Sequence, residues 1–491
     1  TYFNKSDLMK NSLIEIFLKN IFLPVLTAII ICFESPLSAD ENHNDDGDWA
    51  PFQLSLFNPI QIFNEKSNIY GLRLNVLYGV NRDVIGLDLG LVNKAEDVYG
   101  AQLGIIRNIV KGDMGGFQLG IANDVDGSMI LMQTALYRNM VKDSMYGIQT
   151  ALLDNRVEGR VFGMQTAIRE NISGEFSVAI QTALRNNMAR GRLAGIQTAF
   201  GINQVTGDFT GMQTAIHNQI EGHGAGFQTA FGTNQAAGGF TGMQTAFGWN
   251  FTGDTLTGFQ TSIGGNGVEG NANAIQTSIG FNFVISEQVK PGFLDILSFI
   301  WDPALTMSSL LGPKSETGGN FNGLQTSLMN GAACHVNGIQ TAIFWNIAGS
   351  MNGIQLSGAK NIVTHDMKGI QINITTNSVV GYMYGVQGAF FNNTATGGMN
   401  GIQVALFTNN TAEMNGIQIA AANMQSFFKD EETTSNGIQI GLFNYSEKFR
   451  GVQIGVVNWS RRMVGVQIGV LNIIQNNPVP VFPVINISTT F

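Results

Sequence analysis

Apolar and polar or small residues alternate along short segments of this chain, and the segments recur along its length. In one late segment, Ile438, Ile440 and Leu442 are separated by Gln439 and Gly441. A period of two residues is typical of a β-strand, because successive side chains point to opposite faces. No helix can be fitted to this pattern, since helical apolar positions recur every three to four residues. The pattern therefore predicts an all-β protein.

The recurring unit carries a glutamine at a fixed place, mostly at intervals of 15 or 16 residues. Gly-Ile-Gln-Thr-Ala at 147–151, for example, returns as Gly-Met-Gln-Thr-Ala at 163–167. The glutamine occurs 12 times from Gln102 to Gln276 and 10 times from Gln325 to Gln467. Arg73 and Asp88 take its place in two earlier copies, which makes about 24. Internal repetition of this kind predicts a repeat architecture.

Each strand segment is followed by an asparagine and then by a glycine. We expect both to be turn residues that tolerate positive φ angles. The asparagines on which this rests include Asn155, Asn171, Asn187 and Asn218.

Two β folds could use about 24 copies of such a unit. The units can stack as short coils of a parallel β-solenoid, or they can be antiparallel strands of an outer-membrane β-barrel. The connections are alike in length from unit to unit, and Tyr and Trp total only 14, which favours the solenoid. The alternation that ends in Phe491 favours the barrel, which stays open as the alternative.

Stacked coils would align identical side chains in ladders. We expect the Ile/Met, Thr/Ile and Leu/Phe positions to face inwards as the core. We expect the glutamines to form an outward ladder with a structural or binding role, although a buried ladder remains open if each amide pairs with the next. The ladder residues are Gln149, Gln165, Gln181, Gln197, Gln213, Gln228, Gln244 and Gln260.

The N-terminal residues 1–39 have the layout of a secretory signal peptide, with Met9 as the expected start. The twelve apolar residues from Ile21 to Cys32 are too few to span a bilayer as a helix. Small residues before Asp40 are consistent with cleavage after Ala39. An uncleaved membrane anchor and a lipid on Cys32 are the alternatives.

The rest of the chain divides into six segments. We expect an acidic linker at 40–50, an N-terminal cap at 51–70, repeats at 71–282, a helical insertion at 283–318, further repeats at 319–472, and a C-terminal cap or terminal strand at 473–491. In the insertion, apolar residues recur at helical spacing. The resulting helix would pack beside the repeats or contact a partner or a membrane. Its apolar residues are Phe293, Ile296, Leu297, Ile300, Trp301 and Leu305.

Composition and motifs limit the classes of function and partner that we expect for this chain. The net charge is −9 with only 26 Lys and Arg, so we expect no nucleic-acid partner. Cys334 and His335 are adjacent, but a zinc site needs about four ligands, so we expect no metal and no cofactor. Phosphate-binding loops and nucleophile motifs are missing, and carboxylates are scattered. We therefore expect no enzyme, with a polysaccharide-acting β-helix enzyme as a remote alternative.

Several motifs resemble the leptospiral surface-repeat proteins. These motifs are 51–63, 71–75, 86–93, the Gly-x-Gln-Ile-Gly-x-x-Asn copies at 437–444, 451–458 and 465–472, and Pro-Val-Phe-Pro at 480–483. In the middle of the chain, Gln-Thr-Ala replaces Gln-Ile-Gly. The resemblance implies an exported protein at the outer membrane or cell surface of a double-membrane bacterium. It implies a structural or adhesive role towards outer-membrane or host surface molecules, and no catalytic residues. It leaves the oligomeric state open.

Overall fold

The computed structural model describes residues 49–285, 319–425 and 434–491. The expected signal peptide, most of the acidic linker and nearly all of the helical insertion lie outside these residues. Contacts group the chain into two units, residues 1–183 and 184–491, and each is described here by itself.

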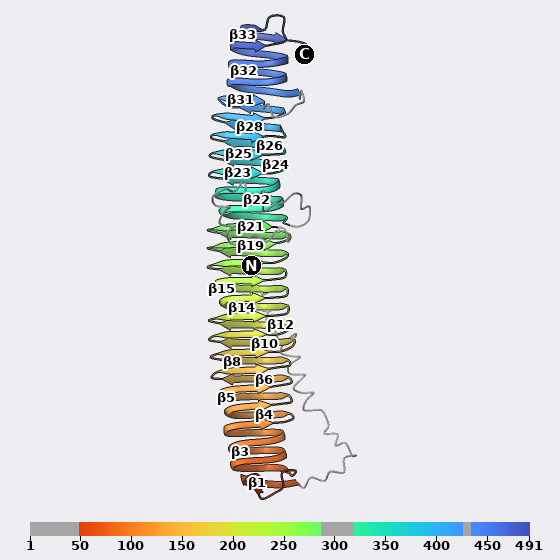
Figure 1. The fold of residues 1–491 in the computed structure, drawn as a ribbon, viewed down its shortest axis with the longest axis vertical. Coiled ribbons are helices and arrows are strands. Elements are labelled where there is room, and N and C mark those ends of the chain that lie inside the picture. The colour runs from red at the N-terminus through yellow and green to blue at the C-terminus, as the bar shows by residue number, and fades with distance from the viewer. Residues whose placement is uncertain (1–48, 286–318, 426–433) are drawn as a thin grey trace, which may run out of the picture. The chain divides into compact units, whose positions relative to one another are not determined.

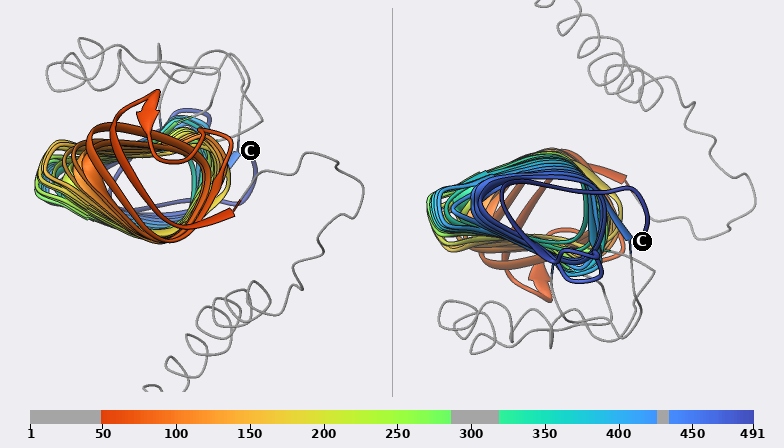
Figure 2. Two further views of the ribbon diagram at one scale, coloured as in Figure 1. Left: turned by 90° about the horizontal axis from the view of Figure 1, so that it is seen from below. Right: turned by 90° about the horizontal axis from the view of Figure 1, so that it is seen from above.

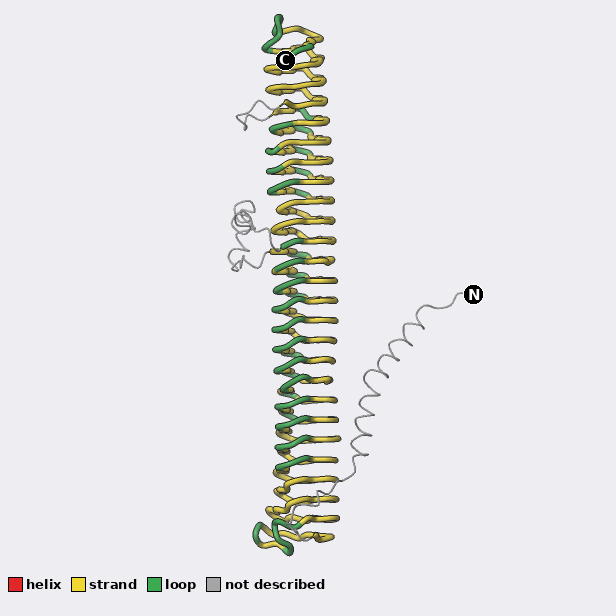
Figure 3. Tube along the Cα trace, turned by 90° about the vertical axis from the view of Figure 1, so that its right-hand side faces the viewer, coloured by secondary structure: helices red, strands yellow, loops and turns green. Residues whose placement is uncertain are grey.

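The described residues form an all-β parallel β-solenoid of about 22 turns. Strands of successive repeats lie side by side in parallel, as Figure 1 shows within each unit, and equivalent residues face each other. Gln149 stands opposite Gln165 in the first unit, and Gln213 opposite Gln228 in the second. This pairing is the solenoid arrangement predicted by the uniform repeats and excludes the antiparallel alternative for these strands. Figure 3 shows strands in every coil, joined by loops in many coils and continuous in others, with no helix in the described part.

The strands of the first unit are β1 to β10. Their bounds are β1 Trp49–Phe57, β2 Ile60–Gln61, β3 Asn68–Val110, β4 Met114–Val125, β5 Met129–Val141, β6 Met145–Ala151, β7 Asp154–Val157, β8 Val161–Ala167, β9 Glu170–Ser173 and β10 Ser177–Ala183.

The strands of the second unit are β11 to β33. Their bounds are β11 Asn186–Ala189, β12 Leu193–Ala199, β13 Ile202–Val205, β14 Phe209–Ile220, β15 Gly224–Ala236, β16 Phe240–Ala246, β17 Trp249–Thr252, β18 Leu256–Ser262, β19 Gly265–Glu269, β20 Ala272–Ser278, β21 Phe281–Ile285, β22 Phe321–Ser357, β23 Lys360–Val363, β24 Met367–Asn373, β25 Thr376–Val379, β26 Tyr382–Ala389, β27 Asn392–Ala395, β28 Gly398–Ala405, β29 Thr408–Thr411, β30 Met414–Ile419, β31 Ala422–Gln425, β32 Thr434–Ile474 and β33 Val481–Ser488.

One coil consists of a longer strand that carries the glutamine and a shorter strand that carries the asparagine. In the coil of β6 and β7, Met145, Gln149, Ala151, Asn155 and Val157 are buried. Seen along the stack, the coils of each unit superpose, so equivalent residues form continuous rows (Figure 2). The core of the solenoid is therefore a set of rows, and two of these rows are amides.

The expected assignment of the two strand faces is wrong. Gln149 is completely buried, whereas its neighbour Ile148 is 43% exposed and Leu152 is 50% exposed. The glutamine ladder thus lies inside, and the large apolar residues in and directly after the same strand lie outside. The physical reason is hydrogen bonding, because each buried amide is satisfied by the amides of adjacent coils and does not need water.

The assignment of the asparagines to turns is also wrong. Asn155 lies in β7, Asn171 in β9 and Asn187 in β11, and all are buried. Positive φ angles occur instead two residues before most of the ladder glutamines, at a position that is usually glycine. Gly147, for example, has a φ of +138°.

Gly147 marks a corner at which only glycine fits well. A Cβ atom there would lie 1.9 Å from the carbonyl oxygen of Leu131 in the preceding coil. Leu131 occupies the same corner position in its own coil and has a φ of +93°. A non-glycine residue in this region is strained, so the coil of β5 pays a conformational cost that its neighbours avoid.

Antiparallel pairs occur near both termini of the described chain. β2 pairs with the end of β1, while β1 itself pairs in parallel with β3. β33 runs antiparallel along β32, with Gln467 opposite Asn486. The segments expected to act as caps, 51–70 and 473–491, contain these strands.

The segment between β21 and β22 does not shift the register. Gln276 still stands opposite Gln325, and β21 pairs in parallel with β22. The same is true where β30 meets β32, with Gln418 opposite Gln439. The register of the glutamines therefore continues across both interruptions of the sequence repeat.

Candidate functional site: an internal amide ladder and an apolar outer face

The predicted glutamines form a continuous hydrogen-bonded ladder within each unit. From the second glutamine of each unit onwards, each Nε2 donates to the Oε1 of the glutamine one coil earlier, over 2.6–3.0 Å. Gln149, Gln165 and Gln181 belong to the first unit. The others, Gln197, Gln213, Gln228, Gln244 and Gln260, belong to the second. All eight are buried, so this ladder holds the core together and is closed to an external ligand.

A second ladder is formed by the asparagines, and the sequence analysis missed it. Asn155 Nδ2 donates to Asn171 Oδ1 over 2.9 Å and to the Thr166 carbonyl oxygen over 2.8 Å, both in the next coil. Its donors therefore point towards the C-terminus, opposite to those of the glutamines. Because the second bond reaches the glutamine strand of the next coil, each asparagine ties the two sides of the solenoid together.

The glutamine ladder of the first unit ends on a buried ion pair. Gln102 Nε2 donates to Asp88 Oδ2 over 2.8 Å. Arg73 donates to both oxygens of the Asp88 carboxylate, over 2.7 and 2.6 Å, and to the Lys94 carbonyl oxygen over 2.8 Å. Asn75 Nδ2 adds a bond of 3.1 Å to Asp88 Oδ1. Both charged side chains are fully buried, so the pair terminates the row of amides inside the core.

The exposed counterpart of the glutamine strand is an apolar face. We define it in the second unit by two rows of side chains, each 37–70% exposed. Row A precedes the ladder glutamines and consists of Met212, Phe227, Met243, Phe259 and Ile275. Row B follows ladder glutamines by three residues and consists of Phe200, after Gln197, and of Phe231, Phe247, Ile263 and Ile279, after four of the glutamines that row A precedes. Large exposed apolar surfaces mark sites of interaction more often than chance.

A row of threonines separates row A from row B. These side chains point outwards from the same strands, and Thr261 Oγ1 lies 3.1 Å from Thr277 Oγ1 in the next coil. Within row B, Phe231 and Phe247 stack with ring centroids 5.0 Å apart. Thr is smaller than Phe, Met or Ile, so the face consists of two ridges with a shallow groove between them.

Charges lie away from this face. The glutamine strand segments Leu193–Ala199, Phe209–Ala215, Gly224–Ala230, Phe240–Ala246, Leu256–Ser262 and Ala272–Ser278 contain no Asp, Glu, Lys or Arg. Between residues 184 and 279, the charged side chains sit on the connections and on the asparagine strands.

In the first unit, charged residues pair across adjacent coils. Asp126 contacts Lys111 over 2.8 Å and Lys142 over 2.7 Å. Hydrogen bonds from Lys111 and then Lys142 lower the pKa of the Asp126 carboxyl below its ordinary value. Burial, followed by the charge of Asp97, raises the pKa of Asp83. Asp154, one of the scattered carboxylates, pairs with Arg169.

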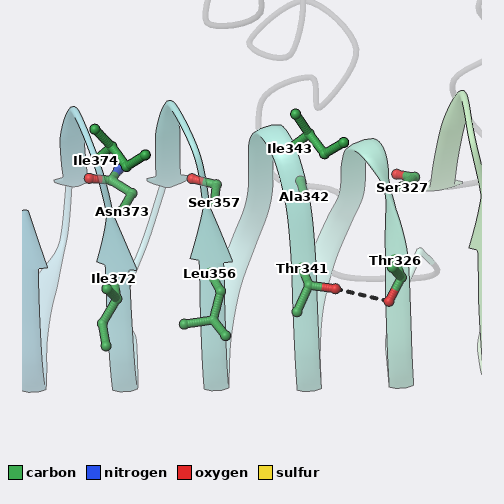
Figure 4. A pocket seen from close by; sticks show the side chains of 10 residues that line it. All are labelled: Thr326, Ser327, Thr341, Ala342, Ile343, Leu356, Ser357, Ile372, Asn373 and Ile374. Carbon is green, nitrogen blue, oxygen red and sulfur yellow. Dashed lines mark hydrogen bonds between the residues drawn. The ribbon is translucent and has the colours of Figure 1, made fainter.

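A shallow hollow of about 480 Å³ interrupts the outer surface in β22 and β24 (Figure 4). Gly358 follows Gln355 by three residues, the row B position, so no side chain stands there between Ile343 and Ile374. Thr326 and Thr341 line the other side and lie 2.9 Å apart at their hydroxyl oxygens. The hollow is thus a gap in a row of apolar side chains.

Metal-ligating residues do not gather in the described residues. No group of three or more His, Cys, Asp or Glu side chains there could hold a metal ion. Burial raises the pKa of the Cys334 thiol.

The part of the chain that the structure describes has no helix that could cross a membrane. Comparison with protein-family models, curated proteins and solved structures finds no match to this chain.

Proposed function

We propose that the chain is an exported, non-catalytic repeat protein that acts as a structural or adhesive element at the surface of a double-membrane bacterium. The observation that carries the proposal is the division of the strands into a sealed interior and an apolar exterior. The interior amides are engaged with one another. What the fold offers to other molecules is therefore its outer surface, which in the second unit includes the apolar face.

The cellular location in this proposal rests on the sequence. Residues 1–39 have the features of a secretory signal, and several motifs resemble leptospiral surface-repeat proteins. A solenoid suits such a location because its stability comes from contacts between neighbouring coils, with no dependence on disulfides or metals.

Surface labelling tests the proposal. The full chain would be expressed in a double-membrane bacterium with Cys334→Ser as the background. Gln235→Cys introduces a thiol at an exposed position on the asparagine side, outside the apolar face, and Ala246→Cys introduces one inside the core. We expect a membrane-impermeant maleimide to label Gln235→Cys on intact cells and to leave Ala246→Cys unlabelled until the protein is denatured. Labelling of Gln235→Cys only after lysis would contradict surface exposure.

A further inference from the structure

We infer that the apolar face of the second unit, defined by rows A and B, is a dimer interface that packs against the same face of a second copy of this chain. The inference rests on the proposed function and names what its outer surface binds. Three features of the face support a second copy as the occupant: its area, its lack of charge and its period.

The area is sufficient for a stable dimer. The two rows contribute ten large apolar side chains, roughly half exposed. A side chain of this class has about 150–250 Å² of surface, so the exposed part of the ten is on the order of 1,000 Å². A standard interface buries about 800 Å² on each partner. Rows A and B therefore meet this requirement without the rest of the outer surface.

The absence of charge favours a like partner. When two copies of this face meet, neither copy has to bury an unpaired Asp, Glu, Lys or Arg from its glutamine strands. A charged partner would pay that desolvation cost with nothing to offset it. A lipid surface favours a face bordered by Lys and Arg. Here the neighbouring connections carry both signs, as at Arg192 and Asp208, which form an ion pair.

The period of the face gives the strongest argument. Coils are spaced by the distance between paired strands, about 4.8 Å, and each coil repeats the sequence of ridge, threonine and ridge. A second copy has the same period, so a contact formed in one coil can be formed again in every coil. A two-fold axis through the face would let a ridge of each copy enter the threonine groove of the other. Such a contact ends at a dimer, because each copy covers the apolar face of the other and leaves none for a third copy.

The test compares the mass of the full chain in solution with that of two charge variants. Phe227→Asp/Phe231→Asp places charges in both rows of one coil. Gln235→Asp adds a charge at an exposed position on the asparagine side of that coil and serves as the matched control. We expect sedimentation equilibrium to give a dimer for the wild type and Gln235→Asp. We expect dimerisation of the double variant to weaken by at least tenfold.

A cross-linking measurement keeps the test informative if the double variant fails to fold. In the Cys334→Ser background, Thr245→Cys puts one thiol in the groove, and we expect mild oxidation to give a disulfide-linked dimer. Thr206→Cys, on the asparagine side, should not cross-link.

The opposite outcomes would overturn the inference. A wild type that is monomeric at about 100 µM, a concentration well above the dissociation constant of a stable dimer, would overturn it. A dimer that the double variant does not weaken would overturn it as well. Sedimentation of a monomer with phosphatidylglycerol vesicles, lost in the double variant, would identify a lipid surface as the occupant instead. Surface labelling is independent of mass, so a protein that is labelled on intact cells but monomeric would leave the proposed location standing and reject the dimer alone.

Discussion

The glutamine ladder of the first unit begins differently from the way the ladder of the second unit ends. In the first unit the ladder ends at Gln102, whose amide nitrogen donates to the buried Asp88–Arg73 pair. In the second unit the ladder ends at Gln467, whose Oε1 has no hydrogen-bond partner although it is buried. The nitrogen of Asn486, the residue opposite, is directed to the carbonyl oxygens of Pro480 and Asn472 instead.

This difference follows from the direction of the amides. Every glutamine donates towards the N-terminus, so that end of the ladder presents a donor and the other end presents an acceptor. A carboxylate satisfies the donor, and Arg73 neutralises the carboxylate. The asparagine ladder runs the other way, and the orphaned oxygen at its N-terminal end is Asn75 Oδ1. A stack of amides thus needs an acceptor at one end and a donor at the other. At the end where a glutamine donor is left over, the acceptor is the Asp88 carboxylate, paired with Arg73.

The largest expected effect comes from breaking the charged end. Asp88→Asn leaves Arg73 buried without its counter-ion, and we expect a loss of about 3–5 kcal/mol of unfolding free energy. Chemical denaturation of the first unit's transition would measure it. The control is Arg73→Gln/Asp88→Gln, which extends the amide ladder and should recover most of the loss. A double variant as unstable as Asp88→Asn would show that the ion pair itself is required.

A smaller loss of stability is expected when the ladder is broken in its interior, and a still smaller one when it is broken at its C-terminal end. Gln149→Leu removes the donor of Gln133 Oε1 and the acceptor of Gln165 Nε2. Gln165 Nε2 keeps a longer bond of 3.3 Å to the Ile172 carbonyl oxygen, so only Gln133 Oε1 loses its partner completely. An orphaned buried group costs about 1–3 kcal/mol, and with the weakened bonding of Gln165 we expect a total loss of about 2–4 kcal/mol.

Gln467→Leu is the matched variant at the end. It removes an acceptor that is already orphaned, and Gln453 Oε1 keeps its bond from Ser460 Oγ at 2.9 Å. We expect a loss below about 1 kcal/mol. Equal losses for the two variants, measured by the same denaturation, would contradict the directional account of the ladder.

The corner position provides the next comparison, between two coils of the first unit. Gly147→Ala forces a side chain into a positive-φ position with a close backbone neighbour, and we expect a loss of about 2 kcal/mol. Leu131→Gly relieves strain at the equivalent corner and should gain about 1 kcal/mol, after the entropy cost of glycine. Thermal unfolding would show shifts of opposite sign, and a destabilised Leu131→Gly would mean that packing of the leucine outweighs its strain.

The smallest effect concerns an exposed carboxylate, in contrast to the buried Asp88. The pKa of Asp126 is lowered in the folded state, so its contribution is present above the ordinary value of 3.8 and is lost as the pH falls through the folded pKa. We expect Asp126→Asn to reduce stability near neutral pH by about 0.5 kcal/mol, because the pair is solvent-screened. The variant and the wild type should converge in acid, and a constant difference across the pH range would contradict this origin.

Much of the fold could be predicted from the sequence, because strand alternation and repeat length are local properties. Gln149 and Gln165 stand 16 residues apart, and the structure places them opposite each other. The inward face could not be derived from alternation, since a period of two gives the same pattern for either orientation. Hydrophobicity then favoured Ile148 as the buried residue, and that choice was wrong.

A signal that would have corrected the choice is present in the repeats. Gln stays the same in 22 copies, while the preceding position varies among Ile, Met, Phe, Leu, Val and Ala. An amide ladder needs the identical side chain at every rung, whereas an exposed position has no such requirement. Asn155 and its equivalents carry the same signal and were assigned to turns because asparagine is common there. The Arg73–Asp88 termination could not be derived in this way, since it depends on the direction of the amides.

The constant register has a consequence for how the gene can change. A tandem duplication of one whole repeat adds one rung, and a deletion removes one. Either change leaves the remaining Gln and Asn residues opposite others of their kind. The pairing of Gln276 with Gln325 over 2.8 Å shows that even a long stretch of additional sequence between rungs is tolerated. Copy number is therefore a variable that recombination can adjust without a compensating mutation inside any coil, provided that the two special ends are kept.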